Sequence, residues 1–390
     1  MTENCIVVDL PENHHAKLNK DIEDRLRYQV EGLKSIIFNA DNTTATITIQ
    51  AKDENEQNLA KDKIGEILNQ VTFLPLEFNE SVLYEHAPKY LFQDVIEEAK
   101  ALDLLYEYAP GVYSYRGFLF NLKQYLDQLF TDLALKIGAK AIELPSFILT
   151  SDLLKTGHFE TFPHHVYLSG HIDFIKEKCQ IKKSDDSFKL KEVLNHHTTH
   201  SDFCLTPSVC YNYYRSLQDK MLKSFEETIV TAKCRCFRYE LSTVSAFQRQ
   251  REFEMREIIF LGSPDRVAGF REMLLKKIWE IAVSFDLKSR VQNAFDPFFT
   301  ENLGPRAAVQ FNRNMKFELV ANYEKNKDVA ISSFNIHSST FGKAFNIKDP
   351  EGKITNSGCI GFGLERWVLC LIAKYGLTKS QWPSEFHHLF

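Results

Sequence analysis

The chain has 390 residues, of which 44% are hydrophobic and 25% charged, and its formal net charge is −5. This composition is typical of a soluble globular protein of two or three domains with a large core. It excludes a membrane-spanning protein, because no apolar run reaches the roughly 18–20 residues needed to cross a bilayer, and it shows no basic stripe or tail of the kind that binds nucleic acid.

The N-terminal sequence and the cysteines favour a cytoplasmic protein. The first fifteen residues, MTENCIVVDLPENHH, lack the basic region and long apolar stretch of a secretory signal. Eight cysteines are scattered over the long chain without the spacing of a disulfide scaffold. We therefore expect free thiols or metal ligands.

Residues 1–78 are predicted to form a small accessory domain. Alternating strands and amphipathic helices succeed one another in the order β-α-β-β-α, which indicates a small α/β sandwich. The predicted elements are Cys5–Asp9, Lys17–Val30, Ser35–Phe38, Thr44–Gln50 and Asn55–Val71. Because it carries no catalytic set, docking or folding support is the simplest role for this unit.

Residues 85–390 are predicted to form the main, α+β domain. Residues 76–88 are interpreted as a connector. Helical spacing follows at Phe118–Ile137 and an extended segment at Ala139–Ile148, while the polar stretch 180–200 is predicted to be a surface excursion. Three β-rich blocks are predicted at 231–262, 306–323 and 328–336, with a helix at 263–285 whose Ser263-Pro264 start is a favourable N-cap.

An arginine and a glutamate end the first predicted strand of a hairpin. Arg238 and Glu240 lie two residues apart, so their side chains share one face of a strand. A guanidinium fork suits a phosphate, and a carboxylate can accept from an adenine amino group. A cross-strand ion pair is the alternative, and on this short pattern alone it is favoured.

A glycine-rich strand near the C-terminus leads directly into a helix. The segment Gly358–Arg366 reads GCIGFGLER, and helical apolar spacing follows it. Glycines allow close approach of a ligand to the backbone. Arg366 is expected in the first helical turn, where a polyphosphate is favoured.

In this order, and after a helix and strand that end at Pro145, these elements resemble the three signature motifs of class II aminoacyl-tRNA synthetases over roughly residues 90–375. The resemblance implies a six-stranded antiparallel sheet flanked by helices, bent ATP bound with Mg²⁺, and a homodimer. It assigns Arg238 to the α-phosphate and Arg366 to the γ-phosphate as catalytic residues. The full ATP-binding set that it implies is Arg238, Glu240, Arg249, Phe253, Glu318, Ser333 and Arg366, with Glu240 at the adenine amino group, Phe253 stacked on the ring and Glu318 at ATP and magnesium.

Three further residues become a candidate zinc site through this resemblance. From spacing alone, Cys210 and Cys359 are better explained as buried free cysteines. A minority of class II enzymes, however, place zinc on facing strands at the positions that match Cys210, Glu257 and Cys359. Such a three-ligand set leaves a fourth position open for the substrate's α-amino group. Ser208 stands where ordinary seryl enzymes have a glutamate, so Ser208 and Glu257 are predicted to contact the amino acid.

The remaining cysteines and histidines are given structural interpretations. Cys204, Cys234, Cys236 and Cys370 are predicted to lie in the core. A solvated loop is favoured over a metal site for His196, His197 and His200, and packing is favoured for the aromatic stretch that starts at Tyr211.

The zinc set is similar to that of the atypical seryl-tRNA synthetases of methanogens and, more closely, of amino acid–[carrier protein] ligases. Matching stretches are 205–211, 247–258, 333–342, 375–377 and 382–383. The resemblance implies that glycine or alanine is activated with ATP and loaded onto the phosphopantetheine thiol of a carrier protein. A true aminoacyl-tRNA synthetase and a non-catalytic paralogue remain as alternatives. A tRNA partner is not expected, since the N-terminal unit lacks a long heptad pattern. That unit is a departure, because many carrier-protein ligases are little more than the catalytic core.

Overall fold

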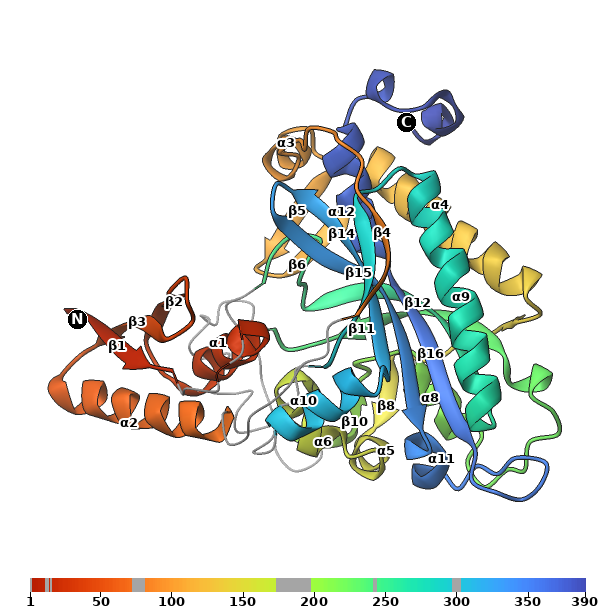
Figure 1. Ribbon diagram of the computed structural model, residues 1–390, viewed down its shortest axis with the longest axis horizontal. Helices are drawn as coiled ribbons and strands as arrows, with labels where there is room; N and C mark the ends of the chain where they lie inside the picture. The colour runs from red at the N-terminus through yellow and green to blue at the C-terminus, as the bar shows by residue number, and fades with distance from the viewer. Residues whose placement is uncertain are drawn as a thin grey trace.

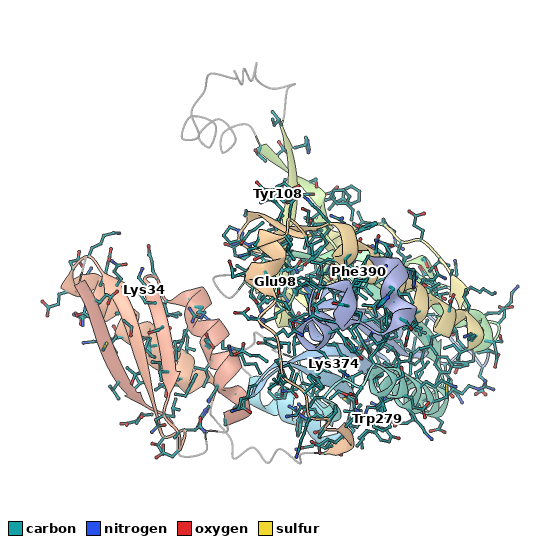
Figure 2. All side chains as sticks on the ribbon, turned by 90° about the horizontal axis from the view of Figure 1, so that it is seen from above. Lys34, Glu98, Tyr108, Trp279, Lys374 and Phe390 are labelled. Carbon is teal, nitrogen blue, oxygen red and sulfur yellow. The ribbon has the colours of Figure 1, made fainter. Side chains whose placement is uncertain are left out.

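The computed structural model describes residues 2–10, 14, 16–71, 81–172, 198–240, 244–296 and 303–390. None of the helices in these ranges is long and apolar enough to cross a membrane. Figure 2 shows two parts, a small N-terminal unit marked by Lys34 and a larger body that carries Tyr108, Trp279 and Phe390.

The N-terminal unit is a three-stranded antiparallel sheet packed on two helices, and its elements follow the predicted β-α-β-β-α order. They are β1 (Thr2–Asp9), a short 3-10 turn η1 (Ala16–Leu18), α1 (Asn19–Gln29), β2 (Leu33–Phe38), β3 (Thr44–Ala51) and α2 (Glu54–Val71), with sheet order β1-β3-β2. In the central strand Ala45, Ile47 and Ile49 are buried under the helices, while the intervening threonines are partly exposed. The period-two pattern therefore sets which face of this sheet is covered.

The larger body is built on an eight-stranded sheet. Its order is β4-β13-β14-β15-β16-β12-β11-β7, antiparallel throughout except for the short parallel pair β7–β11. The strands are β4 (Val82–His86), β7 (Lys140–Ala141), β11 (Val230–Phe237), β12 (Glu252–Gly262), β13 (Ser289–Asn293), β14 (Lys316–Glu324), β15 (Lys327–Ser338) and β16 (Asn356–Gly363). The six central strands form the expected antiparallel sheet, and β4 and β7 extend it at its edges.

Long helices cover one face of this sheet. They are α4 (Gly117–Lys136), α9 (Pro264–Ser284) and α12 (Leu364–Tyr375), and in Figure 1 α4 and α9 run alongside the sheet on the side away from the N-terminal unit. Phe130 of α4 stacks on Phe362 with ring centroids 4.1 Å apart and lies 5.1 Å from Trp367. The helix that follows Ser263 begins as predicted, since the Ser263 side chain accepts from Arg266 N–H at 3.5 Å.

The opposite face carries short elements and the candidate site. Alternate residues of β12 divide between the two faces: Ile258 and Phe260 meet the long helices, whereas Ile259 and Leu261 meet the second core. That second core contains residues of α8 (Cys210–Ser216) and α11 (Thr340–Ala344). The other small elements are α3 (Ile96–Ala101), β5 (Leu105–Ala109), β6 (Val112–Tyr115), β8 (Phe147–Leu149), α5 (Thr150–Lys155), α6 (His158–Thr161), η2 (Pro163–His165), β9 (Leu168–Ile172), β10 (Thr198–Leu205), η3 (Glu226–Thr228), α10 (Leu303–Asn312), η4 (Lys379–Gln381) and η5 (Ser384–Leu389).

Several local predictions were wrong. The β-rich block 306–323 begins instead with α10, whose buried Ala307 and Phe311 have the i, i+4 spacing of one helix face. The connector 76–88 contains the edge strand β4. The segment 139–148 is a strand only at its two ends. Of the predicted excursion 180–200, residues up to 197 lie outside the described residues, and Thr198 begins β10.

Candidate active site

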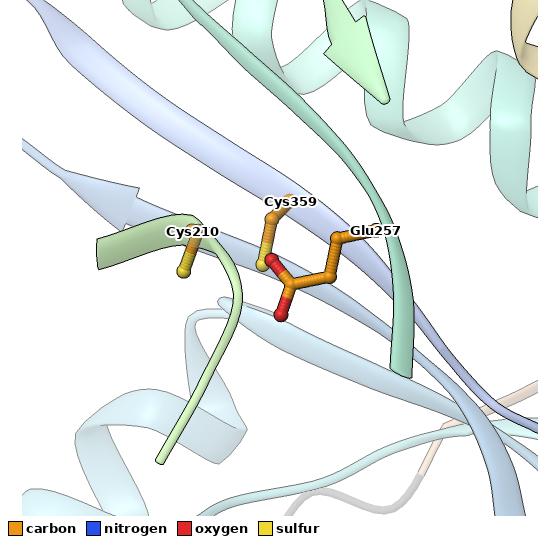
Figure 3. Close-up of side chains that lie close together, drawn as sticks. All are labelled: Cys210, Glu257 and Cys359. Atoms are coloured by element: carbon orange, nitrogen blue, oxygen red, sulfur yellow. The ribbon is translucent and has the colours of Figure 1, made fainter. Parts of the chain in front are cut away.

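Cys210, Glu257 and Cys359 converge on the face of the sheet opposite the long helices (Figure 3). Their nearest ligand atoms all lie within 4.8 Å of one another, and all three residues are buried. Sheet register explains the pairing of two of them: Ile259 lies opposite Cys359, so Glu257, two residues earlier on the same face, is its diagonal neighbour. The sequence predicts Cys210 on a strand. In the structure Cys210 is instead the first residue of α8.

The surroundings of these three side chains suit a metal ion. Glu257 Oε1 accepts from Ser208 Oγ at 3.0 Å and from Val209 N–H at 3.3 Å, whereas its buried Oε2 has no hydrogen-bond partner among the described residues. Cys359 Sγ lies 3.6 Å from Asn335 Nδ2 and 3.7 Å from His337 Nε2. Two sulfurs and a carboxylate with an unused oxygen, backed by outer hydrogen bonds, fit a zinc ion with one position left open.

Burial and mutual hydrogen bonding shift the pKa values of the three groups. Burial raises the pKa of the Glu257 carboxyl and of the Cys210 thiol well above their usual ranges. The pKa of Cys359 is held well below its usual range, because its sulfur accepts from the Cys210 thiol and lies beside His337. Of the two neighbouring thiols, Cys359 is therefore the one that more readily loses its proton.

Arg238, Arg249 and Arg366 lie close to one another and form a cluster of positive charge. Arg366, in the first turn of α12, donates through Nε to Gln248 O at 2.8 Å and through a terminal nitrogen to Ala330 O at 3.0 Å. Burial, followed by the charges of Arg249 and Arg238, lowers the pKa of Arg366 to about 10. A bound polyanion would relieve the electrostatic repulsion among these arginines, so the cluster suits a polyphosphate.

The predicted hairpin carries Arg238, and the strands β11 and β12 pair from Val230–Ile259 to Phe237–Glu252. Arg238 donates to Pro207 O at 3.2 Å, and its guanidinium carbon lies 5.2 Å from the centroid of the Phe253 ring. Glu240 pairs with Arg249 at 3.4 Å. An ion pair, the simpler explanation of this pattern, is therefore present at Glu240, and its partner is Arg249.

Three predicted residues lie in one row across the sheet. Glu318 is paired in register with Ser333, Ser333 with Gly361, and Gly361 with Glu257. A Cβ on Gly361 would stand 3.1 Å from Ser333 Oγ and 3.3 Å from Met255 Sδ, so glycine keeps this row open. The row joins the candidate magnesium-binding carboxylate to the candidate metal set.

Sequence reasoning missed several polar residues at the site. Lys316 is buried between Asp296, at 2.6 Å, and Glu318, at 2.9 Å. Burial alone would lower the pKa of Lys316, but these two carboxylates raise it. His337 lies inside the stretch 333–342 that carried the family resemblance, yet nothing marked its role. No sequence motif marks His158, because its hydrogen-bond partner Tyr211 is 53 residues away and only the folded chain brings the two together.

The remaining sequence-based interpretations concern the other cysteines, the histidines near residue 200 and the aromatic run 211–214. Cys204, Cys234, Cys236 and Cys370 are buried, as predicted. His200 is exposed on β10, while His196 and His197 lie outside the described residues. The aromatic run 211–214 forms helix α8, in which Tyr214 is fully buried and stacks on Phe341, confirming packing for that residue.

Comparison with known proteins defines the class. Residues 188–375 match the tRNA synthetase class II core domain (G, H, P, S and T). Together with the sheet and helices described above, this match over just under half of the chain confirms the resemblance to a class II synthetase core and supports a ligase activity.

The chain is similar to two kinds of ligase. It is 28% identical over 281 residues to amino acid–[acyl-carrier-protein] ligase 1 of Bradyrhizobium diazoefficiens, covering 71% of this chain and 84% of that protein. It is 28% identical over 270 residues to the type-2 serine–tRNA ligase of Methanocaldococcus jannaschii, covering 63% and 49%. The chain thus spans about half the length of this serine–tRNA ligase.

Solved structures share the fold. M. kandleri SerRS, in complex with A. aeolicus tRNASec, superposes with a TM-score of 0.69 at 18% identity, covering 99% of this chain and 77% of that one. Seryl-tRNA synthetase from Pyrococcus horikoshii, complexed with ATP, gives a TM-score of 0.57 at 13% identity, covering 83% and 74%.

Proposed function

We propose that the protein activates glycine or alanine with ATP and transfers the aminoacyl group to the phosphopantetheine thiol of a carrier protein. The observation that carries this proposal is the buried set Cys210, Glu257 and Cys359, whose hydrogen-bond partner Ser208 directly follows the Pro207 carbonyl to which Arg238 donates, with Arg249 and Arg366 close to Arg238. A site for an amine next to a site for a polyphosphate is what amino acid activation requires.

In the first step, an oxygen of the amino acid carboxylate attacks the α-phosphorus of ATP. A phosphorus–oxygen bond forms, the bond to the departing diphosphate breaks, and aminoacyl-AMP remains. Arg238 and Arg366 stabilise the negative charge that spreads over the phosphates. Phe253 and Glu240 hold the adenine, and Glu318 and Ser333 bind ATP with its Mg²⁺. Arg249, which pairs with Glu240, also binds the phosphates of ATP.

Cys210, Glu257 and Cys359 would hold Zn²⁺, which would supply a Lewis acid for the substrate's free amine. Ser208 orients Glu257 by its hydrogen bond and faces the amino acid. In the second step the carrier thiol attacks the acyl carbon, a carbon–sulfur bond forms, the bond to AMP breaks, and the thiol proton passes to the phosphate of the departing AMP. We propose that a homodimer forms through α4, the helix of the first motif.

Two observations favour a carrier over tRNA as acceptor. The carrier-protein ligase is matched over 84% of its length, the serine–tRNA ligase over only 49%. Residues 1–71 contain thirteen acidic and eight basic side chains, and such a unit repels a phosphate backbone. The alternative, a seryl-type synthetase, is favoured by the fold likeness to M. kandleri SerRS, which covers nearly the whole chain. A non-catalytic paralogue is disfavoured, because Arg238, Glu240 and Arg366 are all present.

The test has two stages. ATP–diphosphate exchange, measured over a panel of amino acids, should respond to glycine or alanine. Radiolabelled amino acid is then offered with a phosphopantetheinylated carrier protein, with the same carrier lacking its phosphopantetheine, or with bulk tRNA. We expect label only on the first acceptor. Serine-dependent exchange with loading of tRNA alone would establish the synthetase alternative, and absence of exchange with every amino acid would favour the paralogue.

A further inference from the structure

A buried histidine near the candidate site has a ring nitrogen that the protein does not use. His158 begins α6 and is only 4% exposed. Its Nδ1 lies 3.0 Å from the hydroxyl of Tyr211. Its Nε2 is buried and has no hydrogen-bond partner among the described residues. Because buried polar atoms are nearly always paired, this nitrogen indicates a ligand group that completes the site.

The neighbours of His158 place it between the two halves of the active site. Tyr211 directly follows the candidate metal ligand Cys210, and its ring packs 5.1 Å from Phe341 on the site face. On the other side, the loop after Arg238 is tied to the segment that follows α6, since Tyr239 N–H donates to His165 O at 3.1 Å. His158 is therefore linked to the amine end of the site through Tyr211 and to the α-phosphate end through Arg238.

Charge and burial keep the imidazole neutral. Burial, together with the positive charge of Arg238, lowers the pKa of His158 to about 3. A neutral imidazole has one protonated nitrogen, and which one it is depends on the partner of the other. The 3.0 Å contact fits either direction, and we assign the Tyr211 hydroxyl as the donor to Nδ1, which places the proton on Nε2 and makes it a hydrogen-bond donor with no acceptor in the described protein.

We propose that His158 is a substrate-contacting residue whose Nε2–H donates to the carboxylate oxygen of the amino acid that does not bond to phosphorus. This inference rests on the proposed function. That oxygen belongs to the group joining the amine-bearing carbon to the α-phosphate, and so lies between the two ends that His158 adjoins. When a thiol attacks the acyl carbon, the same oxygen gains negative charge until the carbon–oxygen bond to AMP breaks, and a fixed donor stabilises it. Tyr211 is the positioning residue that sets the tautomer.

Two isosteric substitutions separate this role from packing. In His158→Asn the amide still reaches Tyr211 but nothing occupies the position of Nε2. In His158→Gln the amide nitrogen reaches that position. We expect His158→Asn to lower the rate of glycine- or alanine-dependent exchange, and of thiol loading, by about 10²-fold. The KM for ATP, the zinc content and the melting temperature should be unchanged. His158→Gln should recover most of the lost rate.

The outcomes distinguish this inference from the function on which it rests. Exchange and loading at the normal rate in His158→Asn, with the unaltered protein active, would overturn the role of His158 alone. Equal losses in the Asn and Gln variants, together with a lower melting temperature, would also overturn it, because they indicate packing only. If the unaltered protein activates no amino acid, the proposed function itself fails.

Discussion

The buried carboxyl group of Glu257 has one oxygen that accepts hydrogen bonds from Ser208 and Val209. Its other oxygen has no hydrogen-bond partner among the described residues. A buried carboxylate is rarely left without a cation or a full set of hydrogen bonds. The two thiols that share its pocket are the soft ligands that zinc prefers. These three residues therefore support a metal centre better than they support an apolar core.

The first prediction concerns these ligands. Purified protein should contain about one zinc ion per chain. Cys210→Ser and Cys359→Ser should each lose the ion together with amino acid-dependent exchange, because a serine hydroxyl is a poor zinc ligand. Elemental analysis and the exchange assay measure the two losses. Cys204→Ser is the matched control, since Cys204 is also buried, lies outside the candidate metal set, and has its sulfur 3.3 Å from the Thr150 hydroxyl. Active protein without zinc would contradict the metal assignment.

The second prediction concerns the arginines. Arg238→Ala and Arg366→Ala should each slow ATP–diphosphate exchange by ~10²–10³-fold, because each removes a charged donor from the phosphates. Arg266→Ala serves as the control: Arg266 is an exposed arginine paired with Glu226 at 2.9 Å, and exchange should be unaffected. Circular dichroism checks that the fold is intact. Unchanged exchange in both site variants would refute the assignment of the two motifs.

Individual residues differ in how far the sequence reveals them. Arg366 could be identified because a glycine-rich strand and a helix start are both local signals. Cys210, Glu257 and Cys359 have no local spacing signal, and only the order of the surrounding motifs connected them. His158 could not be found, because its partner Tyr211 is 53 residues away and only the folded chain brings them together.

Among the secondary-structure elements, α4, β12 and α12 are joined by a buried charge network. Lys123 of α4 lies 3.1 Å from Glu254 of β12 and 3.4 Å from Glu365 of α12. Backbone N–H of Glu254 also donates to Glu365 at 3.1 Å. Burial raises the pKa of Glu365, although Lys123 acts to lower it. The lysine thus offsets part of the cost of burying a carboxyl group between helix and sheet.

The third prediction follows from this network. Lys123→Met should lower the free energy of unfolding by about 3 kcal/mol at pH 7, because it leaves buried carboxylates without their cation. The pKa of Glu365 would then rise further above its value in the unfolded chain. A carboxyl group of this kind favours the folded state when it is protonated, and this advantage is lost as the pH rises through the folded pKa. The deficit relative to the unaltered protein should therefore be larger at pH 8 than at pH 5.

Urea unfolding at the two pH values tests this prediction. Lys136→Met, an exposed change near the end of the same helix, should have little effect. Lys123→Met combined with Glu365→Gln should recover part of the loss, since the uncompensated charge is gone. A deficit that does not vary with pH would show that Lys123 acts through its aliphatic stem alone.

The predictability of the elements followed the strength of their patterns. The twenty-residue helix α4 and the capped helix α9 were predicted within two residues of their bounds. Helix α10 was misassigned, because its burial is shared with another part of the chain and its short apolar run also suits a strand. Strand β4 was missed, since an edge strand gains its identity by pairing with β13 and not from its own composition.

At the scale of the whole molecule, the N-terminal unit has its own hydrophobic core. Helix α10 of the larger body contributes side chains to that core. Ala307 and Phe311 of α10 are buried in the cluster that contains Leu26, Ile47 and Ile64. From α10, Gln310 Nε2 donates to Asp296 at 2.8 Å, and Asp296 pairs with Lys316 at 2.6 Å beside Glu318. The unit thus packs against a helix that supports one edge of the proposed ATP site, while its own residues include none of the predicted site residues.

The sequence predicted the composition of this unit but not its attachment. Its alternating strands and amphipathic helices are local patterns that can be recognised in isolation. The contact with α10 joins segments more than two hundred residues apart, and no periodicity reports it. Of the proposed division, residue 78 lies within 72–80, outside the described chain, and residue 85 lies within strand β4 of the larger sheet.

The last prediction is that the N-terminal unit is dispensable for amino acid activation. A chain that begins at Ser81 keeps every predicted ligand of ATP, metal and amino acid, so it should still exchange diphosphate with glycine or alanine and retain its zinc. It should also melt at a lower temperature, because Ala307 and Phe311 lose their cover and apolar surface becomes exposed. The full-length Phe311→Ala variant is the matched control: it should reproduce part of the lower melting temperature while the unit remains present. A shortened chain that holds zinc and melts cooperatively but catalyses no exchange would show that the N-terminal unit takes part in activation. If the shortened chain instead exchanges normally and fails only to load a carrier protein, the unit acts in recognition of the acceptor.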